Sequence, residues 1–143
     1  MYEYLIIDLL DDKVGNYKIA EERLKSLFKG TCKNFIVATV NVPEKDRNSH
    51  KVEYIRWSSE RLFQTCKTVC YDGDLIIILN IKYNEEVEYT KVKLTNFLRE
   101  NNLVAGLSRT FSNIMDIRKY YTQSKKALRL GGLLKKNPAL KWD

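Results

Sequence analysis

Residues 69–79, VCYDGDLIIIL, predict a β-hairpin at the centre of a sheet. Asp72-Gly73 is the strongest hairpin signal in the chain, because glycine readily takes the positive φ that a tight turn requires. The short extended segment Val69–Tyr71 precedes the turn, and Leu75–Leu79 follows it as the partner strand. Since all five residues of that second strand are apolar, we expect it to be the most buried element of the domain.

The segments before the hairpin predict a strand and a helix. Residues 34–42 contain FIVATV, an almost unbroken β-branched run that suits a central strand. A polar loop over residues 43–50 follows. Apolar residues then recur at helical spacing as far as Cys66, so we expect a helix that ends there, just before the hairpin.

The segments after the hairpin predict a helix and a fourth strand. Asn84 is expected to cap a helix that ends near residue 101, with Glu85 and Glu86 in its first turn, where carboxylates complement the helix dipole. Residues 103–107 predict the fourth strand, and Gly106 within it indicates the close approach of a neighbouring backbone.

A long helix and a tail complete the chain. Ser112 or Asn113 is expected to cap this last helix, and Gly131-Gly132 to end it. The tail, residues 133–143, is basic with apolar interruptions and suits a short edge strand.

Two helices are expected ahead of these elements. The first ten residues, MYEYLIIDLL, predict a short helix that stops near Asp11-Asp12. Asn16 is expected to cap a second helix that runs to about Lys29 and is closed by Gly30. The order is therefore two helices, then β-α-β-β-α-β, then a helix, which predicts an α+β, ferredoxin-like sheet with strand order 4-1-3-2.

Length and composition indicate one soluble domain. At 143 residues, with 44% hydrophobic and 30% charged residues, the chain can bury a core without a disulfide or a metal. The net charge of +7 is compatible with an acidic partner such as nucleic acid, although many soluble domains carry similar charge without one. No apolar run approaches the roughly 20 residues that span a bilayer, and acidic Glu3 and Asp8 argue against a signal peptide, so we expect a cytoplasmic protein without a membrane partner.

The cysteines predict buried thiols in a reducing compartment. Cys66 and Cys70 stand four residues apart, but no second ligand pair accompanies them, Cys32 is isolated, and His50 is the only histidine. His50 lies in the polar loop and is expected at the surface. The chain has no nucleophile motif, P-loop or dinucleotide-binding fingerprint, so we expect no catalytic residue, cofactor or metal.

The hairpin carries the pattern closest to catalysis. Asp72 and Asp74 place two carboxylates on a β-turn, where nucleotide cyclases and polymerase palms hold part of their metal-binding acids. A partner carboxylate is also needed at the end of the first strand, but that strand ends TVNVP, and the next acids follow in the loop. Asp72, Gly73 and Asp74 are therefore interpreted as turn residues. Weak binding of GTP or a cyclic nucleotide around the two acids is the alternative.

The last helix provides a candidate contact face. Arg118, Lys125 and Arg129 are expected along its exposed side, with Lys126 beside them. Cations attract phosphate without a particular geometry, so direct nucleic-acid binding is one interpretation. We favour a solvated face, because cations near the carboxyl end of a helix also stabilise it through the dipole.

Three segments together resemble the GGDEF-like domain of the CdaR/PucR family of bacterial transcription regulators. The first is LIIDLL at residues 5–10, followed by the helix and strand described above. The second is YDGDLIIIL at residues 71–79, which is similar to a degenerate GGDEF hairpin and its central strand. The third consists of VAGLSR at 104–109, Ser112, Ile117, YYTQSKKAL at 120–128 and Gly131.

This resemblance implies a nucleotide-cyclase-like fold and a single regulatory domain, residues 1–143, from a longer regulator. The chain departs from active diguanylate cyclases at the catalytic positions, because Gly-Gly-acid-acid-Phe is reduced to Asp72-Gly73-Asp74 and the first-strand acid is absent. We therefore expect a non-catalytic domain that self-associates or transmits a signal between a sensor and a helix-turn-helix domain. No helix-turn-helix follows Asp143, so DNA would be reached only through that missing domain.

Overall fold

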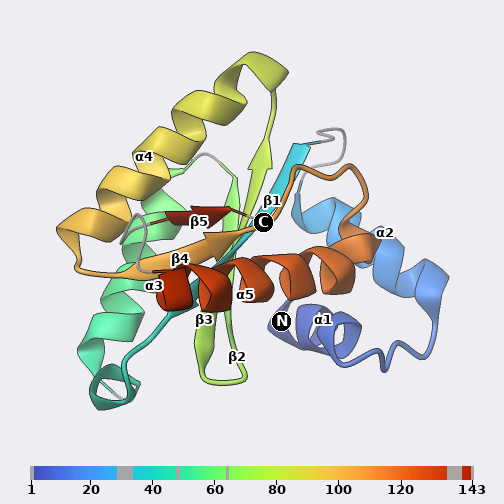
Figure 1. Cartoon of the computed structure of the whole chain (residues 1–143). Helices are drawn as coiled ribbons and strands as arrows, with labels where there is room; N and C mark the ends of the chain where they lie inside the picture. Colours follow the sequence, from blue (N-terminus) through green and yellow to red (C-terminus); the bar gives the residue numbers. More distant parts are fainter. Residues whose placement is uncertain (1, 29–33, 48, 64, 135–139, 143) are drawn as a thin grey trace.

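A five-stranded sheet with helices on both faces forms the framework of the chain (Figure 1). The computed structural model describes residues 2–28, 34–47, 49–63, 65–134 and 140–142. Its strands are β1 (Asn34–Asn41), β2 (Cys66–Tyr71), β3 (Asp74–Ile81), β4 (Val104–Leu107) and β5 (Leu140–Trp142).

The strand order is β2-β3-β1-β4-β5. The first four strands pair antiparallel, and β5 runs parallel to β4. This topology confirms the predicted α+β fold with order 4-1-3-2, and β5 is the additional edge strand expected in the tail.

The β2–β3 hairpin has the predicted two-residue turn. Tyr71 is paired with Asp74, and the two residues between them, Asp72 and Gly73, have φ values of 51° and 80°. Positive φ at both central residues is the type I′ arrangement, whose twist matches that of the flanking strands. Every residue of β3 is buried, as the apolar run predicts.

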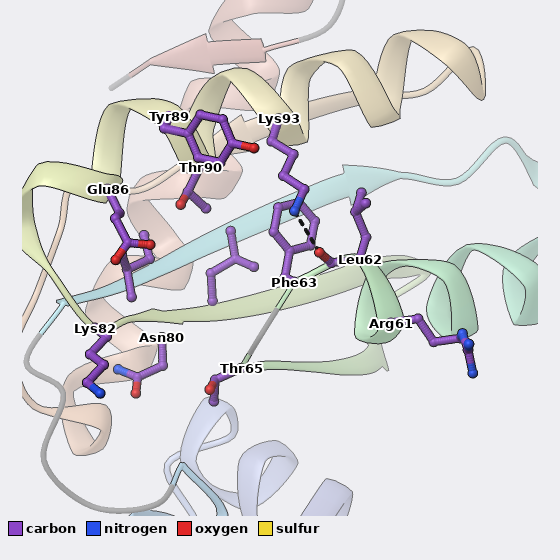
Figure 2. Close-up of a pocket in the computed structure, with 12 residues that line it drawn as sticks. Arg61, Leu62, Phe63, Thr65, Asn80, Lys82, Glu86, Tyr89, Thr90 and Lys93 are labelled. Carbon is purple, nitrogen blue, oxygen red and sulfur yellow. Dashed lines mark hydrogen bonds between the residues drawn. The ribbon is translucent and has the colours of Figure 1, made fainter.

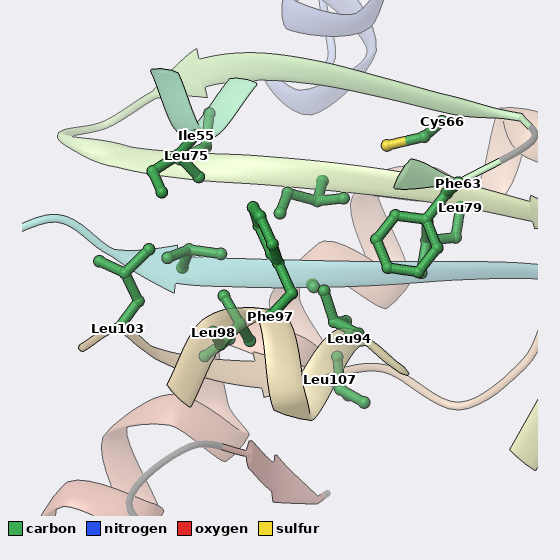
Figure 3. Close-up of a cluster of buried hydrophobic side chains, with 14 of the residues drawn as sticks. Ile55, Phe63, Cys66, Leu75, Leu79, Leu94, Phe97, Leu98, Leu103 and Leu107 are labelled. Atoms are coloured by element: carbon green, nitrogen blue, oxygen red, sulfur yellow. The ribbon is translucent and has the colours of Figure 1, made fainter. Parts of the chain in front are cut away.

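A hydrophobic cluster packs against each face of the sheet. On one face, α3 (His50–Leu62) and α4 (Val87–Glu100) pack against alternate β3 residues such as Leu75, Ile77 and Leu79 (Figure 3). On the other face, α1 (Tyr2–Leu10), α2 (Tyr17–Leu27) and α5 (Ile117–Leu134) pack against Ile76 and Ile78. Burial on both faces explains why β3 lacks the polar alternation of a half-exposed strand.

Three predicted boundaries are wrong. The helix expected to reach Cys66 ends at Leu62, and Cys66 is the first residue of β2, because β3 is long enough to need a partner there. Asn84 does not cap α4 but begins a 3-10 turn, Asn84–Glu86, that leads into it. The last helix continues through Gly131-Gly132 to Leu134.

The predicted cap Asn16 is confirmed, whereas Asn113 caps the 3-10 turn Ile114–Asp116 that leads into the last helix rather than the helix itself. The Asn16 side chain accepts a hydrogen bond from the amide of Ile19 at the start of α2, and the Asn113 side chain accepts one from the amide of Met115, ahead of α5. The expected end of the second helix at Lys29-Gly30 lies outside the described residues. No helix in the described part of the chain has both the length and the hydropathy to cross a bilayer.

Candidate functional site

Asp74 of the hairpin points into the protein. Its carboxylate is 5% exposed and forms an ion pair with Lys125 of α5, whose side chain is 22% exposed. Residue alternation places Asp74 on the same side of β3 as Ile76 and Ile78, which face α1, α2 and α5. Asp72 is exposed and occupies the first left-handed position of the turn. Asp74 is therefore withdrawn into the protein, whereas Asp72 remains at the surface.

The end of β1 also lacks a gathered set of carboxylates. Asn41 is exposed, and the acids that follow lie in a 3-10 turn, Glu44–Asp46, in which Asp46 is 3.8 Å from the ammonium of Lys51. The cavity there is about 10 Å³, too small for more than one water, and its lining is mostly apolar. Nowhere in the described residues do three His, Cys, Asp or Glu side chains form a group that could hold a metal.

The guanidinium of Arg47 lies against the hairpin turn. A Cβ placed on Gly73 would be 3.3 Å from the central carbon of this guanidinium. The Nε of the same side chain donates to the carbonyl of Val42, 3.4 Å away, which ties the loop after β1 to the hairpin. The turn therefore contacts protein on the side that faces the end of β1.

A tyrosine links the hairpin to the end of α1. The Tyr71 hydroxyl donates to the carboxylate of Asp11 at 2.6 Å, and its ring makes an edge contact with Tyr121 of α5. The hydrogen bond to Asp11 raises the pKa of Tyr71 to about 12, with burial as a further cause. Sequence analysis missed this contact, because Asp11 was interpreted only as a helix end.

Tyr71→Phe is expected to remove a stabilising contribution of about 1 kcal/mol, since only the hydroxyl is lost. A pKa raised above the unfolded value means that this contribution is complete below about pH 10 and is lost as the pH rises toward about 12. Urea unfolding of both proteins at pH 7 and pH 11 measures the effect, and tyrosinate absorbance follows the ionisation. If the two proteins differed in free energy of unfolding by the same amount at pH 7 and at pH 11, the assignment of the Tyr71–Asp11 hydrogen bond would be contradicted.

The predicted basic face is divided. Arg118 pairs with Asp12 of the α1–α2 loop at 3.0 Å, and Lys125 turns inward to Asp74. Lys126 and Arg129 are exposed, as expected. The prediction that Lys125 lies on the exposed side of α5 is wrong, because buried Asp74 needs a cationic partner. Two of the four cations are thus occupied by carboxylates of this chain, which weakens the nucleic-acid interpretation.

Within the described residues, the thiols and the histidine form no cluster suited to catalysis. Cys66 is buried as predicted, and burial raises the pKa of its thiol to about 12. Cys70 is exposed, contrary to prediction; it lies next to the hairpin turn, at the other end of β2 from buried Cys66. His50 is exposed at the first position of α3, and Cys32 lies outside the described residues.

A polar pocket of about 340 Å³ lies at the other end of the sheet, where β3 ends and α4 begins (Figure 2). Three cations, Arg61, Lys82 and Lys93, line it with one acid, Glu86, and with the ring of Tyr89. The Lys93 ammonium donates to the last carbonyl of α3, on Leu62, at 2.9 Å. The guanidinium of Arg61 lies 4.8 Å from the centre of the Trp57 ring and points away from the other lining side chains (Figure 2). Lys82 and Lys93 therefore outnumber Glu86 in the lining, beside the ring of Tyr89.

Sequence analysis did not find this pocket. Its cations come from α3, from the residue after β3 and from α4, about 10 to 20 residues apart, so each resembles an ordinary surface charge. Only the pairing of β2 with β3 and the packing of α4 bring them together. The spacing of positive residues around an exposed Tyr89 was the available signal, and it is weak.

The comparisons with known proteins support the fold. The solved structure of a microbial GGDEF domain, described for its interaction with bis-(3,5)-cyclic di-GMP, is similar to this chain with a TM-score of 0.59. The similarity covers 99% of this chain and 87% of that chain, at 12% sequence identity. No protein-family model and no curated protein matches the sequence. The chain therefore has a GGDEF-like fold, as the sequence resemblance implied.

Proposed function

We propose that this GGDEF-like chain is a non-catalytic signalling domain that acts through contacts of its helices. The observation that carries the proposal is the buried ion pair between Asp74 and Lys125. A catalytic carboxylate must face the substrate or its metal ions, whereas this one neutralises a lysine of α5. The hairpin thereby serves as a docking point for α5.

Two further observations support the loss of catalysis. The strand that should supply the second metal-binding acid ends in Asn41. The neighbouring cavity of about 10 Å³ is far below the volume of several hundred Å³ that a small-molecule site requires.

Incubation of the purified chain with GTP and Mg²⁺ or Mn²⁺ tests this proposal. We expect the GTP to be recovered unchanged, with no cyclic nucleotide in the chromatogram, while an active diguanylate cyclase handled in parallel converts it. Formation of any cyclic product that Asp74→Asn abolishes would refute the non-catalytic assignment.

We further propose that the domain belongs to a bacterial transcription regulator of the CdaR/PucR type, in which it self-associates or links a sensor to a helix-turn-helix. The support is the sequence resemblance over residues 5–10, 71–79 and 104–131. Sequencing the gene on both sides of this segment tests the proposal. A reading frame that continues into a helix-turn-helix supports it, and a stop codon directly after Asp143 overturns it.

Nucleotide binding without turnover is a second candidate function, favoured by the pocket of Figure 2. Its volume of about 340 Å³ suits a small ligand, its cations suit phosphate, and Tyr89 offers a ring on which a base can stack. The similar GGDEF domain is described with cyclic di-GMP. The cavity beside the end of β1, by contrast, is only about 10 Å³.

Calorimetric titration with GTP and with cyclic di-GMP distinguishes this candidate. If it is correct, binding weakens with salt and drops at least tenfold in Lys93→Met, which keeps an unbranched side chain but removes the charge. Arg99→Gln, at the opposite end of α4, is the matched control. Binding of neither nucleotide, or equal binding by all three proteins, would eliminate the candidate.

A further inference from the structure

We propose that the first turn of α1 is a removable cover over the free edge of β2, and that its release allows β2 to pair with β2 of a second copy of this chain. This inference goes beyond the proposed function and does not depend on it. Among the strands that the structure describes, β2 is the last on its side of the sheet, so one side of its backbone pairs with none of them.

The register identifies which backbone groups face outward. Tyr71 pairs with Asp74 across the two-residue turn, so Lys67, Val69 and Tyr71 direct their amides and carbonyls toward β3. The carbonyl of Thr65, in the same alternation, accepts the amide of Asn80 at 3.0 Å. The amides and carbonyls of the intervening residues, Cys66, Thr68 and Cys70, therefore point away from the sheet.

Side chains from both faces of the sheet meet at the centre of this edge. The Tyr2 hydroxyl of α1 donates to the outward carbonyl of Thr68 at 3.0 Å. Arg56 of α3 donates to the same carbonyl at 3.4 Å and also forms an ion pair with Glu3 of α1. Because α1 lies on one face and α3 on the other, the Glu3–Arg56 pair crosses the edge.

These contacts bury a residue that an edge strand would ordinarily expose. Thr68 is 0% exposed, and its hydroxyl accepts from the Nε of Arg56 at 3.0 Å and donates to Glu60 at 2.5 Å. On the α1 side, the ammonium of Lys67 lies 5.5 Å from the centre of the Tyr2 ring. A strand cannot add to β2 while Tyr2, Glu3 and Arg56 occupy this position.

The cover can open locally. The first turn of α1 forms the cover, and its Tyr2 is only partly buried where it packs against the hydrophobic cluster. The buried Ile6, Leu9 and Leu10 anchor the rest of the helix in the core. Helix ends fray at low free-energy cost, so the first turn can separate while the remainder stays packed. Arg56 then keeps its ion pair with Glu53 on α3 and its hydrogen bond to the Thr68 hydroxyl. It loses Glu3, the partner that holds it across the edge.

The edge is self-complementary, which identifies a second copy as its occupant. Its outward groups come from three alternate residues centred on Thr68. Antiparallel pairing about a two-fold axis at that residue places Cys66 opposite Cys70 of the second copy. An isologous contact of this kind requires no other sequence, and the paired sheets extend into a continuous sheet across both chains.

The double variant Tyr2→Phe with Glu3→Gln tests the proposal, because it removes the hydroxyl and the charge but retains the ring and the apolar face of α1. Tyr4→Phe with Glu22→Gln makes the same chemical changes at exposed positions and is the control. In dilute solution the amides of Thr68 and Cys70 should exchange rapidly with deuterium, because they point away from β3. At rising concentration the variant should form a dimer by light scattering, in which these amides are protected by pairing with the second copy, whereas the control should stay monomeric.

Adding Cys70→Pro to the double variant should abolish the dimer, since proline removes an outward amide. A double variant that stays monomeric, or a dimer whose β2 amides stay unprotected, overturns the proposal. If the double variant folds poorly, the single Tyr2→Phe change carries the same expectations at smaller amplitude.

Discussion

Gly106→Ala adds one methyl group and is expected to lower the free energy of unfolding by about 3 kcal/mol or more. This is the largest effect that we predict for a substitution. A Cβ on Gly106 would lie 2.0 Å from the carbonyl oxygen of Ser124 and 2.5 Å from the amide nitrogen of Leu128. Both atoms belong to the backbone of α5, so no side-chain rotation can relieve the clash. The whole helix must move away from β4.

The surrounding contacts oppose that movement. The hydroxyls of Thr39 on β1 and Ser124 on α5 are hydrogen-bonded at 2.6 Å, and both residues are 0% exposed. Ile117 and Ala127 fix the same helix face in the interior. Displacing α5 therefore breaks a buried hydrogen bond and opens voids in the packing, and each of these adds to the cost of the clash.

Guanidinium chloride unfolding measures this effect, and Gly15→Ala is the matched control. A Cβ on Gly15 meets nothing within 4 Å, so its substitution should change the free energy of unfolding by less than about 0.5 kcal/mol. A Gly106→Ala protein as stable as the Gly15→Ala protein would show that α5 does not lie where this structure places it.

Lys125→Met is expected to cost about 2–3 kcal/mol, the second-largest effect. It leaves the Asp74 carboxylate, 5% exposed, without its cation. The expected cost lies below that of a fully buried pair because Lys125 itself is 22% exposed and water screens part of the interaction. Urea unfolding near pH 7 is the measurement.

A variant that lacks both Asp74 and Lys125 distinguishes the loss of the ion pair from the cost of a buried carboxylate without a cation. Asp74→Leu with Lys125→Met should recover most of the lost stability, because no buried charge then remains. Lys126→Met, at an exposed neighbouring position, should change the free energy of unfolding by less than about 0.5 kcal/mol. A double variant that is less stable than Lys125→Met alone would contradict the pairing.

The parts of the fold that could be predicted are those encoded locally. Asp72-Gly73 specifies its turn by conformation, and the apolar run after it specifies a strand covered on both faces. Gly106 indicated a close backbone, although α5 could be identified as that neighbour only from the structure. Boundaries that depend on strand pairing were not predicted. Helical spacing of apolar residues continues to Cys66, but the pairing of Cys66 with Leu79 of β3 makes it the first residue of β2.

In the candidate site, too, features encoded locally were predicted and those set by tertiary contacts were not. The sequence placed Asp72 correctly in the turn, but Asp74 is the buried first residue of β3 rather than a turn residue. Its partner Lys125 was placed on the solvent side of α5. Helical periodicity predicts which residues of α5 share a face. It does not reveal that the buried carboxylate of Asp74 lies opposite Lys125. The pocket with Arg61, Lys82 and Lys93 was missed for a related reason, since three segments contribute one cation each.

The most direct test of the central claim is to record the amide spectrum of the labelled chain while Mn²⁺ and GTP are added together. Paramagnetic Mn²⁺ broadens signals of nuclei close to it, so the hairpin amides report directly on whether the carboxylates hold a metal–nucleotide complex. With Asp74 paired to Lys125 and no acid at the end of β1, the signals of Asp72, Gly73 and Asp74 should stay sharp. Selective broadening of these three signals at stoichiometric Mn²⁺ would contradict the claim that the hairpin has lost its catalytic role.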